Sequence, residues 1–184
     1  MAAARNGTVD PVLRDGIRLL IVGVNPGLWT AVVNAPFARP GNRFWPALEA
    51  GGVLPRRVDA SRGLRTADRE LLLSRGVGIT NLVNRATARA DELSREELRQ
   101  GARDLQQVVR YTHPRLIAVA GIVAYREAFE DPHAVQGPQP RELCGVPLWV
   151  LPNPSGLNAH ETVASLGLAF GRAAAAAGLV LSAP

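Results

Sequence analysis

Short apolar runs alternate along the chain with longer stretches of helical periodicity. The runs are rich in β-branched residues, are too short for helices and are bounded by turn residues such as Gly, Asn and Pro, which is typical of buried strands. Four strands are predicted on this basis, over residues 18–24, 77–83, 115–120 and 147–151.

Helices are predicted between these strands from apolar spacing and capping residues. Ser94-x-x-Glu97 is a capping box that opens a helix ending near Tyr111. Asn42 caps a short helix that Gly51-Gly52 ends. The other predicted helices cover residues 66–74, 123–129 and 159–177, and irregular stretches are predicted over residues 28–41, 53–65 and 130–142.

Strands that alternate with helices predict a single-domain, three-layer α/β/α sandwich with a central, mainly parallel sheet. The length of 184 residues fits one domain. We expect residues 17–182 to form it and residues 1–16 to be a flexible lead-in. The ligand site of such a sheet lies at the carboxyl ends of its strands. Two predicted strands end there in Asn-Pro sequences, at Asn25 and Asn153, which makes these turns candidates for chemistry.

The basic residues of the chain exclude some kinds of site but do not identify its binding partner. All 21 Lys-plus-Arg residues are Arg, and the formal net charge is +5. The absence of lysine excludes a lysine Schiff base and a P-loop. Arginine forks match phosphate oxygens, so the charge favours a polyanionic partner. An Arg- and Ala-rich, lysine-free composition is equally typical of a GC-rich genome.

The composition predicts neither a metal site nor a membrane-spanning segment. The single cysteine, Cys144, excludes an internal disulfide and a cysteine-based zinc or iron–sulfur site. His113, His133 and His160 share no metal-ligand spacing, so we expect no metal and no cofactor. No apolar run approaches the ~18 residues of a membrane span, and the first residues lack a signal core. We therefore expect a cytoplasmic protein with no membrane partner.

Three ordered motifs carry a family resemblance. The first runs from Gly23-Val-Asn-Pro-Gly-Leu28 to Pro36-Phe-Ala-x-Pro-x-Asn-Arg-Phe-Trp45, the second is Leu82-Val-x-Arg-x-Thr87, and the third is Leu151-Pro-Asn-Pro-Ser-Gly-Leu157. They closely resemble the mismatch-specific uracil-DNA glycosylase family, which includes thymine-DNA glycosylase. The resemblance extends from about Arg18 to the final helix.

The resemblance implies hydrolysis of the bond between a mismatched pyrimidine and deoxyribose in double-stranded DNA. The expected substrate is uracil opposite guanine, or else thymine or ethenocytosine, and the product is an abasic site. Such an enzyme must extrude the base, stabilise it as an anion and direct a water at the anomeric carbon. The absence of lysine argues against a lyase step. We expect a monomer that needs no cofactor.

The same resemblance assigns residues to the base pocket. Asn25 matches the catalytic asparagine, whose amide positions the attacking water; an amide cannot act as a general base at neutral pH. Phe37 matches the aromatic residue on which the flipped base stacks, and Thr30 matches a small residue that limits access to the fifth carbon of the base. The backbone N–H of Gly27 is a candidate donor to the base, since glycine allows close approach.

The third motif implies a wedge that fills the gap left by the flipped nucleotide. Gly156 and Leu157 match this wedge, and Ser155 and Asn158 flank it as further DNA-binding candidates. An apolar side chain can enter a base stack and replace lost contacts. The alternative is that Leu157 packs against the last helix. Bacterial family members can carry an arginine two residues after the wedge leucine, where this chain has Ala159; Asn158 or His160 is a candidate substitute.

The loop of residues 84–92 offers a carboxylate beside this site. Asp91 is a candidate catalytic residue that assists or partly replaces Asn25, because a carboxylate near the anomeric carbon activates water or stabilises the sugar cation. The alternative is a solvated carboxylate favoured by the dipole of the following helix. Four arginines in the candidate DNA-facing loops are either phosphate ligands or solvated cations, namely Arg39, Arg43, Arg85 and Arg89.

Two functions of other classes compete with the glycosylase interpretation. A non-catalytic mismatch or lesion binder of the same fold would keep Leu157 and the arginines but would need no water-positioning amide, so Asn25 argues against it. A hydrolase or binding domain for free nucleotides would need neither a strand-inserting leucine nor a basic surface.

Overall fold

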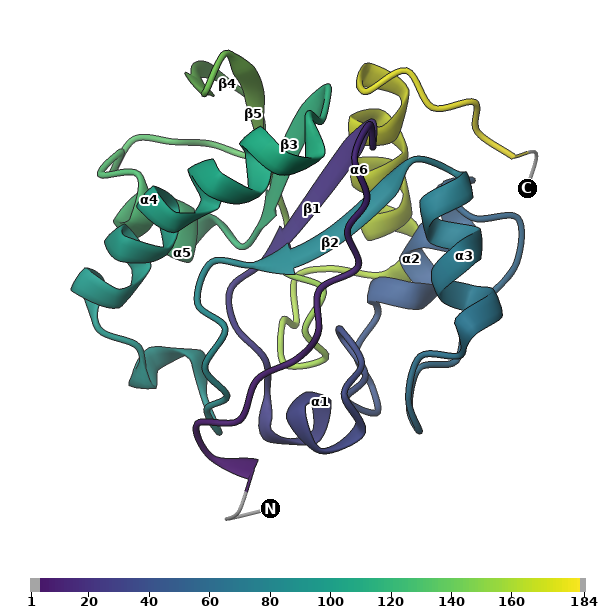
Figure 1. The fold of residues 1–184 in the computed structure, drawn as a ribbon, viewed down its shortest axis with the longest axis horizontal. Coiled ribbons are helices and arrows are strands. Elements are labelled where there is room, and N and C mark those ends of the chain that lie inside the picture. Colours follow the sequence, from purple (N-terminus) through teal and green to yellow (C-terminus); the bar gives the residue numbers. More distant parts are fainter. Residues whose placement is uncertain (1–3, 183–184) are drawn as a thin grey trace.

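One sheet of five strands crosses the computed structural model, which describes residues 4–182 (Figure 1). The strand order is β2-β1-β3-β5-β4, and every pairing is parallel except that of β4 with β5. The strands are β1 (Leu19–Gly23), β2 (Val77–Asn81), β3 (Leu116–Ala120), β4 (Gly137–Leu143) and β5 (Val146–Leu151).

Helices cover both faces of this sheet and complete the predicted α/β/α sandwich. Helices α4 and α5 pack together on one face, while α2 and α6 pack together on the other, with α3 beside them (Figure 1). None of the described helices is long and apolar enough to cross a membrane. The helices are α1 (Leu28–Val33), α2 (Phe44–Ala50), α3 (Thr66–Ser74), α4 (Arg95–Thr112), α5 (Ile122–Ala128) and α6 (Val163–Ala176), with a short 3₁₀ turn, η2 (Ala90–Glu92), before α4.

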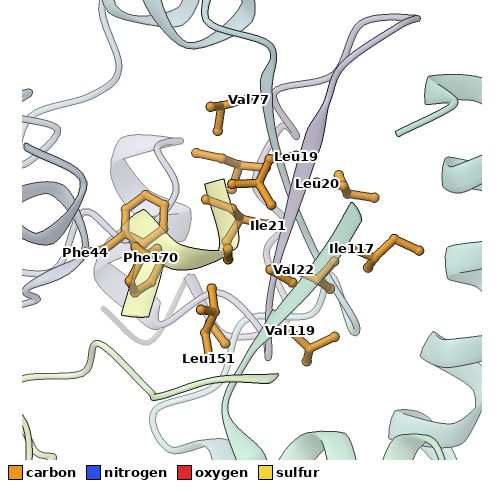
Figure 2. Packing of buried hydrophobic residues seen from close by; sticks show 14 of the residues in the cluster. Leu19, Leu20, Ile21, Val22, Phe44, Val77, Ile117, Val119, Leu151 and Phe170 are labelled. Carbon is orange, nitrogen blue, oxygen red and sulfur yellow. The ribbon is translucent and has the colours of Figure 1, made fainter. Parts of the chain in front are cut away.

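The core follows from the apolar strands. All five residues of β1 and all five of β3 are buried, because both strands are central and covered on both faces. Figure 2 shows Phe44 and Phe170 packed together on one side of the sheet, while Leu20 and Ile117 point to the other. The rings of Phe44 and Phe170 meet edge to face with centroids 5.6 Å apart. This packing fixes α2 against the sheet.

The predicted capping box is confirmed at the start of α4. The backbone N–H of Glu97 donates to the Ser94 hydroxyl at 3.1 Å, and the N–H of Ser94 donates to the Glu97 carboxylate at 2.8 Å. The predicted short helix is also present, although it begins at Phe44 with Arg43 in the capping position. Asn42 still accepts the Phe44 N–H, at 2.9 Å.

The prediction of an irregular stretch over residues 130–142 is wrong, because β4 begins at Gly137. This strand lies at the edge of the sheet, antiparallel to β5, and its register shifts between Pro138 and Glu142. An edge strand tolerates proline, since one side of its backbone makes no ladder hydrogen bonds. Its polar, proline-containing sequence therefore lacks the apolar pattern that predicts a buried strand.

Two helix predictions also need correction. The stretch 28–41 contains α1 (Leu28–Val33), whose C-cap, Asn34, has the left-handed conformation (φ 48°). The three β-branched residues in this helix, Thr30, Val32 and Val33, are weak helix formers, so propensity did not reveal it. The last helix starts at Val163 rather than at residue 159, because Thr162 caps it and residues 152–161 form a loop.

Residues 4–16 lie against the loops that follow β1 and β2. Val12 is fully buried and pairs with Ile79 on the outer edge of β2. The Asn84 amide exchanges two hydrogen bonds with the backbone of Val9, each 3.1 Å long. The flexibility expected of residues 1–16 concerns motion and stays a prediction; residues 1–3 lie outside the described part of the chain.

Candidate active site

A cleft of about 600 Å³ opens at the carboxyl ends of the parallel strands. In Figure 1 this is the side where α1 and the yellow-green loop after β5 lie. The cleft brings together nearly all of the predicted site residues although they are far apart in sequence: Asn25, Gly27, Thr30, Phe37, Asp91, Ser155, Leu157 and Asn158 all line it. Gly156 belongs to the same loop without lining the cleft.

The Asn25 side chain is held by the loop that follows β2. Its Nδ2 donates to the Thr87 hydroxyl at 2.7 Å, to the Arg85 carbonyl at 2.9 Å and to the Pro26 carbonyl at 3.2 Å. The Thr87 hydroxyl donates its own proton to the Arg89 carbonyl at 2.7 Å, so it must accept from Asn25. Because oxygen acceptors surround Nδ2, the amide has one favourable orientation.

That orientation leaves the Asn25 carbonyl oxygen available to a ligand. The oxygen accepts no hydrogen bond from any described residue, and Asn25 lines the cleft. Thr87 is only 2% exposed, so the oriented network lies beneath the cleft surface. No role was assigned to Thr87 from the sequence, although its motif was recognised; a buried threonine in a polar loop was the available signal.

Gly27 and Thr30 lie at the start of α1. Gly27 is the N-cap of this helix, with φ −75°, and its N–H donates to no residue of the described chain. A Cβ at this position would meet no protein atom within 4 Å. The glycine therefore leaves free space at the cleft wall rather than relieving a clash. Thr30 is buried, at 5% exposure, and also lines the cleft.

Phe37 forms an aromatic platform. Its ring stacks on that of Phe44, with centroids 3.8 Å apart and planes 12° apart. The residue has a positive φ of 54°, which is uncommon outside glycine, asparagine and aspartate. Gly23 permits the arrangement, because a Cβ there would lie 3.0 Å from the Phe37 ring. The lining of the cleft by Phe37 fits its predicted place in the base pocket.

Asn81 is a cleft residue that the sequence analysis did not single out. It is the last residue of β2, and a Cβ at Gly23 would lie 2.5 Å from its Oδ1, so a larger residue at 23 would displace this amide. The Asn81 side chain makes no hydrogen bond to a described residue. The signal available in the sequence was a polar amide at the carboxyl end of a buried strand.

Asp91 lies at the rim of the cleft, on η2. Arg89 holds its carboxylate in a two-pronged ion pair, with distances of 2.6 and 3.1 Å, and the Asp91 side chain is 62% exposed. The hydrogen bonds from Arg89 to Asp91 raise the pKa of the Arg89 guanidinium above its usual range. Within residues 4–182, no group of three His, Cys, Asp or Glu side chains is placed to bind a metal.

Leu157 projects from the loop of residues 152–162, which we call the insertion loop. Its side chain is 77% exposed and makes no part of the core, so it does not pack against α6. The loop is closed by its own hydrogen bonds: the Ser155 N–H donates to the Asn153 side chain at 3.0 Å, and the Asn158 side chain donates to the Asn153 carbonyl at 3.0 Å. Asn158 is therefore engaged within the loop, whereas His160 is exposed.

The four arginines of the candidate DNA-facing loops have different surroundings. Arg43 donates to backbone carbonyls of the insertion loop, and Arg85 donates to Glu97 at 2.8 Å. Arg89 is paired with Asp91. Arg39 is exposed at the cleft and has no ion pair among the described residues. Of the four, Arg39 is the one whose guanidinium is open to a phosphate.

Comparison with known proteins places this arrangement in a family. The family model of the uracil DNA glycosylase superfamily matches residues 11–174. Among solved structures, the chain is similar to a protein from Methanosarcina acetivorans whose solution NMR structure is described as that of a candidate uracil DNA glycosylase. That match has a TM-score of 0.63 and 19% sequence identity, and it covers 92% of this chain and 98% of the other. At this identity the match shows a common fold.

Proposed function

Because this chain belongs to the uracil DNA glycosylase superfamily, we propose that it is a monofunctional DNA glycosylase that removes uracil from mismatched double-stranded DNA. Uracil opposite guanine is the proposed substrate, with thymine or ethenocytosine as further ones, and the protein acts as a monomer. The observation that carries the proposal is the oriented amide of Asn25, whose oxygen is open to the cleft.

The proposed reaction is hydrolysis of the bond between the anomeric carbon of deoxyribose and the base nitrogen. The departing base takes the electron pair of this bond, while the sugar develops an oxocarbenium-like charge. Water then adds its oxygen to the anomeric carbon, and its proton is released to the base or to solvent. The protein must therefore orient a water and stabilise an anionic leaving group.

Asn25 supplies the orientation. A water bound to its carbonyl oxygen would be held at a fixed point of the cleft, because three acceptors fix Nδ2. An amide does not remove a proton at neutral pH, so it directs the water without activating it. We propose that Asp91 assists, by electrostatic stabilisation of the sugar cation from the cleft rim; this requires DNA phosphate to compete for Arg89, which now pairs with Asp91.

The cleft also supplies the groups that a flipped base needs. The base would stack on Phe37, a type of contact worth about 1–3 kcal/mol per base. The free N–H of Gly27 would donate to its polar edge, the Asn81 amide would donate to or accept from it, and Thr30 would limit substituents at the fifth carbon. Leu157 would enter the stack that the base leaves.

The proposal is tested with end-labelled duplexes that contain one uracil opposite guanine or adenine, with a single-stranded control, followed by alkaline cleavage of abasic sites. We expect cleavage of the guanine-paired substrate, and a loss of at least about 100-fold in Asn25→Ala, since misplacing a reacting group by about 1 Å costs about that factor. Lesion-selective binding without cleavage would favour the non-catalytic binder. Absence of both would contradict the proposal.

The role of Asp91 is tested separately, by single-turnover cleavage with Asp91→Ala and Asn25→Ala side by side. We expect Asp91→Ala to slow cleavage less than Asn25→Ala does, by about tenfold. Glu70→Ala, which removes an exposed carboxylate of α3 far from the cleft, is the matched control. A rate close to that of the wild type in Asp91→Ala would show that Asp91 is only a solvated rim residue.

A further inference from the structure

We propose that Arg43 is a positioning residue for strand insertion, because it holds the insertion loop in the shape that presents Leu157 to DNA. The inference rests on the proposed glycosylase function. It adds to that function a residue that acts without contacting DNA. It replaces the two sequence-based alternatives for Arg43, a phosphate ligand or a solvated cation.

The position of Leu157 depends on the backbone of its loop. Its side chain is 77% exposed, so no packing contact fixes it. The residues on either side have no regular secondary structure between the end of β5 and the start of α6. An apolar side chain can enter a base stack only if its backbone is already at the right depth, and any contact that orders the loop therefore determines insertion.

Arg43, which precedes α2, supplies such contacts to the loop. One terminal nitrogen donates to the carbonyls of Ser155 and Asn158, each at 2.6 Å, and the other donates to the carbonyl of Glu161. The backbone N–H of Arg43 also donates to the Pro154 carbonyl at 2.9 Å. Three carbonyls from both sides of Leu157 therefore converge on one planar guanidinium, which a lysine could not reproduce.

These bonds leave Arg43 little capacity for a phosphate. Both terminal nitrogens already donate to the loop, and the Nε is buried without a partner among the described residues. A phosphate ligand at this position would have to break the carbonyl contacts that shape the loop. The guanidinium therefore acts on the protein itself.

The backbone of Arg43 adjoins the core. Arg43 occupies the N-cap position of α2, whose first residue, Phe44, is fully buried and stacks on Phe37. The platform for the base and the clamp of the insertion loop are therefore neighbours in sequence. This short connection couples the depth of Leu157 to the position of the ring on which the flipped base would stack.

Gly156 provides an independent contact of the same loop. A Cβ on Gly156 would lie 2.5 Å from the carbonyl oxygen of Gly41, closer than real Cβ atoms come. Gly156→Ala is therefore expected to push the loop away from residue 41 without changing the Arg43 side chain itself. It offers a second way to displace Leu157.

The test is a double-mutant cycle on single-turnover uracil excision from a guanine–uracil duplex. We expect Arg43→Lys and Leu157→Ala each to slow excision by about 100-fold, the usual cost of a misplacement near 1 Å. The double variant should be no slower than the slower single variant, because both changes remove the same insertion step. Gly156→Ala should behave like Arg43→Lys. Arg110→Lys, an exposed arginine of α4 at the opposite end of the sheet, should match the wild type within about threefold.

Hydrogen exchange on the free protein provides a readout that needs no activity. The Asn158 N–H donates to the Ser155 carbonyl at 3.0 Å, so its exchange should accelerate in Arg43→Lys and stay unchanged in Leu157→Ala. Effects that multiply in the double variant, wild-type excision by Arg43→Lys, or unchanged exchange would overturn the inference. A wild-type protein that excises no uracil would instead contradict the proposed function, while the exchange result would still decide whether Arg43 orders the loop.

Discussion

Thr87 is the residue that gives the Asn25 amide its orientation. Its hydroxyl proton is directed at the Arg89 carbonyl, which leaves a lone pair for Asn25 Nδ2. A rotated amide would place the Asn25 oxygen against the Thr87 and Arg85 oxygens and would turn Nδ2 toward the cleft. The orientation of one side chain therefore depends on a buried neighbour.

Thr87→Val tests this dependence with almost no change of shape. Valine cannot accept a hydrogen bond, so the amide loses one of its three acceptors, a bond worth about 1 kcal/mol, and its present orientation is favoured less strongly. We expect the single-turnover excision rate to fall about tenfold, equivalent to about 1.4 kcal/mol, while binding of the duplex is unchanged. Thr66→Val, an exposed threonine at the start of α3, is the matched control. An equal loss of duplex affinity would contradict a pure orienting role.

The individual residues differ in how far their place could be predicted. Asn25 lies in the turn directly after a buried strand, and Phe37 was assigned from the family resemblance; the structure puts both at the cleft. Arg43 and Thr87 could not be assigned from the sequence. The partners of the Arg43 guanidinium are backbone carbonyls 112 to 118 residues away, and Thr87 pairs with a side chain 62 residues away. A carbonyl has no sequence signature, so such contacts emerge only from the folded chain.

Helix α4 and the loop before it are joined through Glu97. Its carboxylate accepts from the Arg85 guanidinium and from the Ser94 N–H, and these hydrogen bonds lower the pKa of Glu97 from 4.5 to about 2. The backbone carbonyl of the same Arg85 accepts from Asn25. The start of α4 therefore supports the loop that orients the Asn25 amide.

The lowered pKa predicts how stability depends on pH. The folded pKa of Glu97 lies below the unfolded one, so this carboxylate stabilises the fold above about pH 4.5, and the contribution disappears as the pH falls to about 2. We expect Glu97→Gln to lower the free energy of unfolding at pH 7, with a difference from the wild type that vanishes near pH 2. Urea denaturation of both proteins across this range measures it. A difference that is constant with pH would contradict the assignment.

Among the elements, the ones predicted correctly are those with a strong apolar pattern. Strands β1 and β3 are entirely buried, and α4 has both a capping box and an apolar face. β4 was missed because an edge strand buries little and tolerates Pro138 and Pro140. α1 was missed because a helix of six residues is too short for propensity to reveal it, and three of its residues are β-branched.

The whole molecule carries more arginine than acidic residues, and this excess positive charge would attract DNA. The formal net charge is +5, yet most arginines near the cleft are engaged with the protein. Affinity for DNA then depends on the few guanidinium groups that remain open. Arg39, exposed at the cleft and without an ion pair among the described residues, is the foremost of these.

Salt dependence of binding tests this view. The logarithm of the affinity for a labelled duplex should fall linearly with the logarithm of the salt concentration, with a slope near −0.9 per phosphate neutralised. Arg39→Ala should make the slope shallower by about 0.9, whereas Arg110→Ala should leave it unchanged. Fluorescence anisotropy between about 50 and about 200 mM salt gives both slopes. Equal slopes for the wild type and Arg39→Ala would show that Arg39 contacts no phosphate.

The clamp on the insertion loop has a consequence for protein engineering. Loops that contact a ligand are attractive units for transplantation between relatives, because scaffolds usually accept them. Here the loop is shaped by the Arg43 guanidinium and by the fit of Gly156 against Gly41. A chimera that receives residues 152–162 alone would contain the leucine but would lack the contacts that set how far it projects from the protein. The transferable module is the loop together with the segment from Gly41 to Phe44.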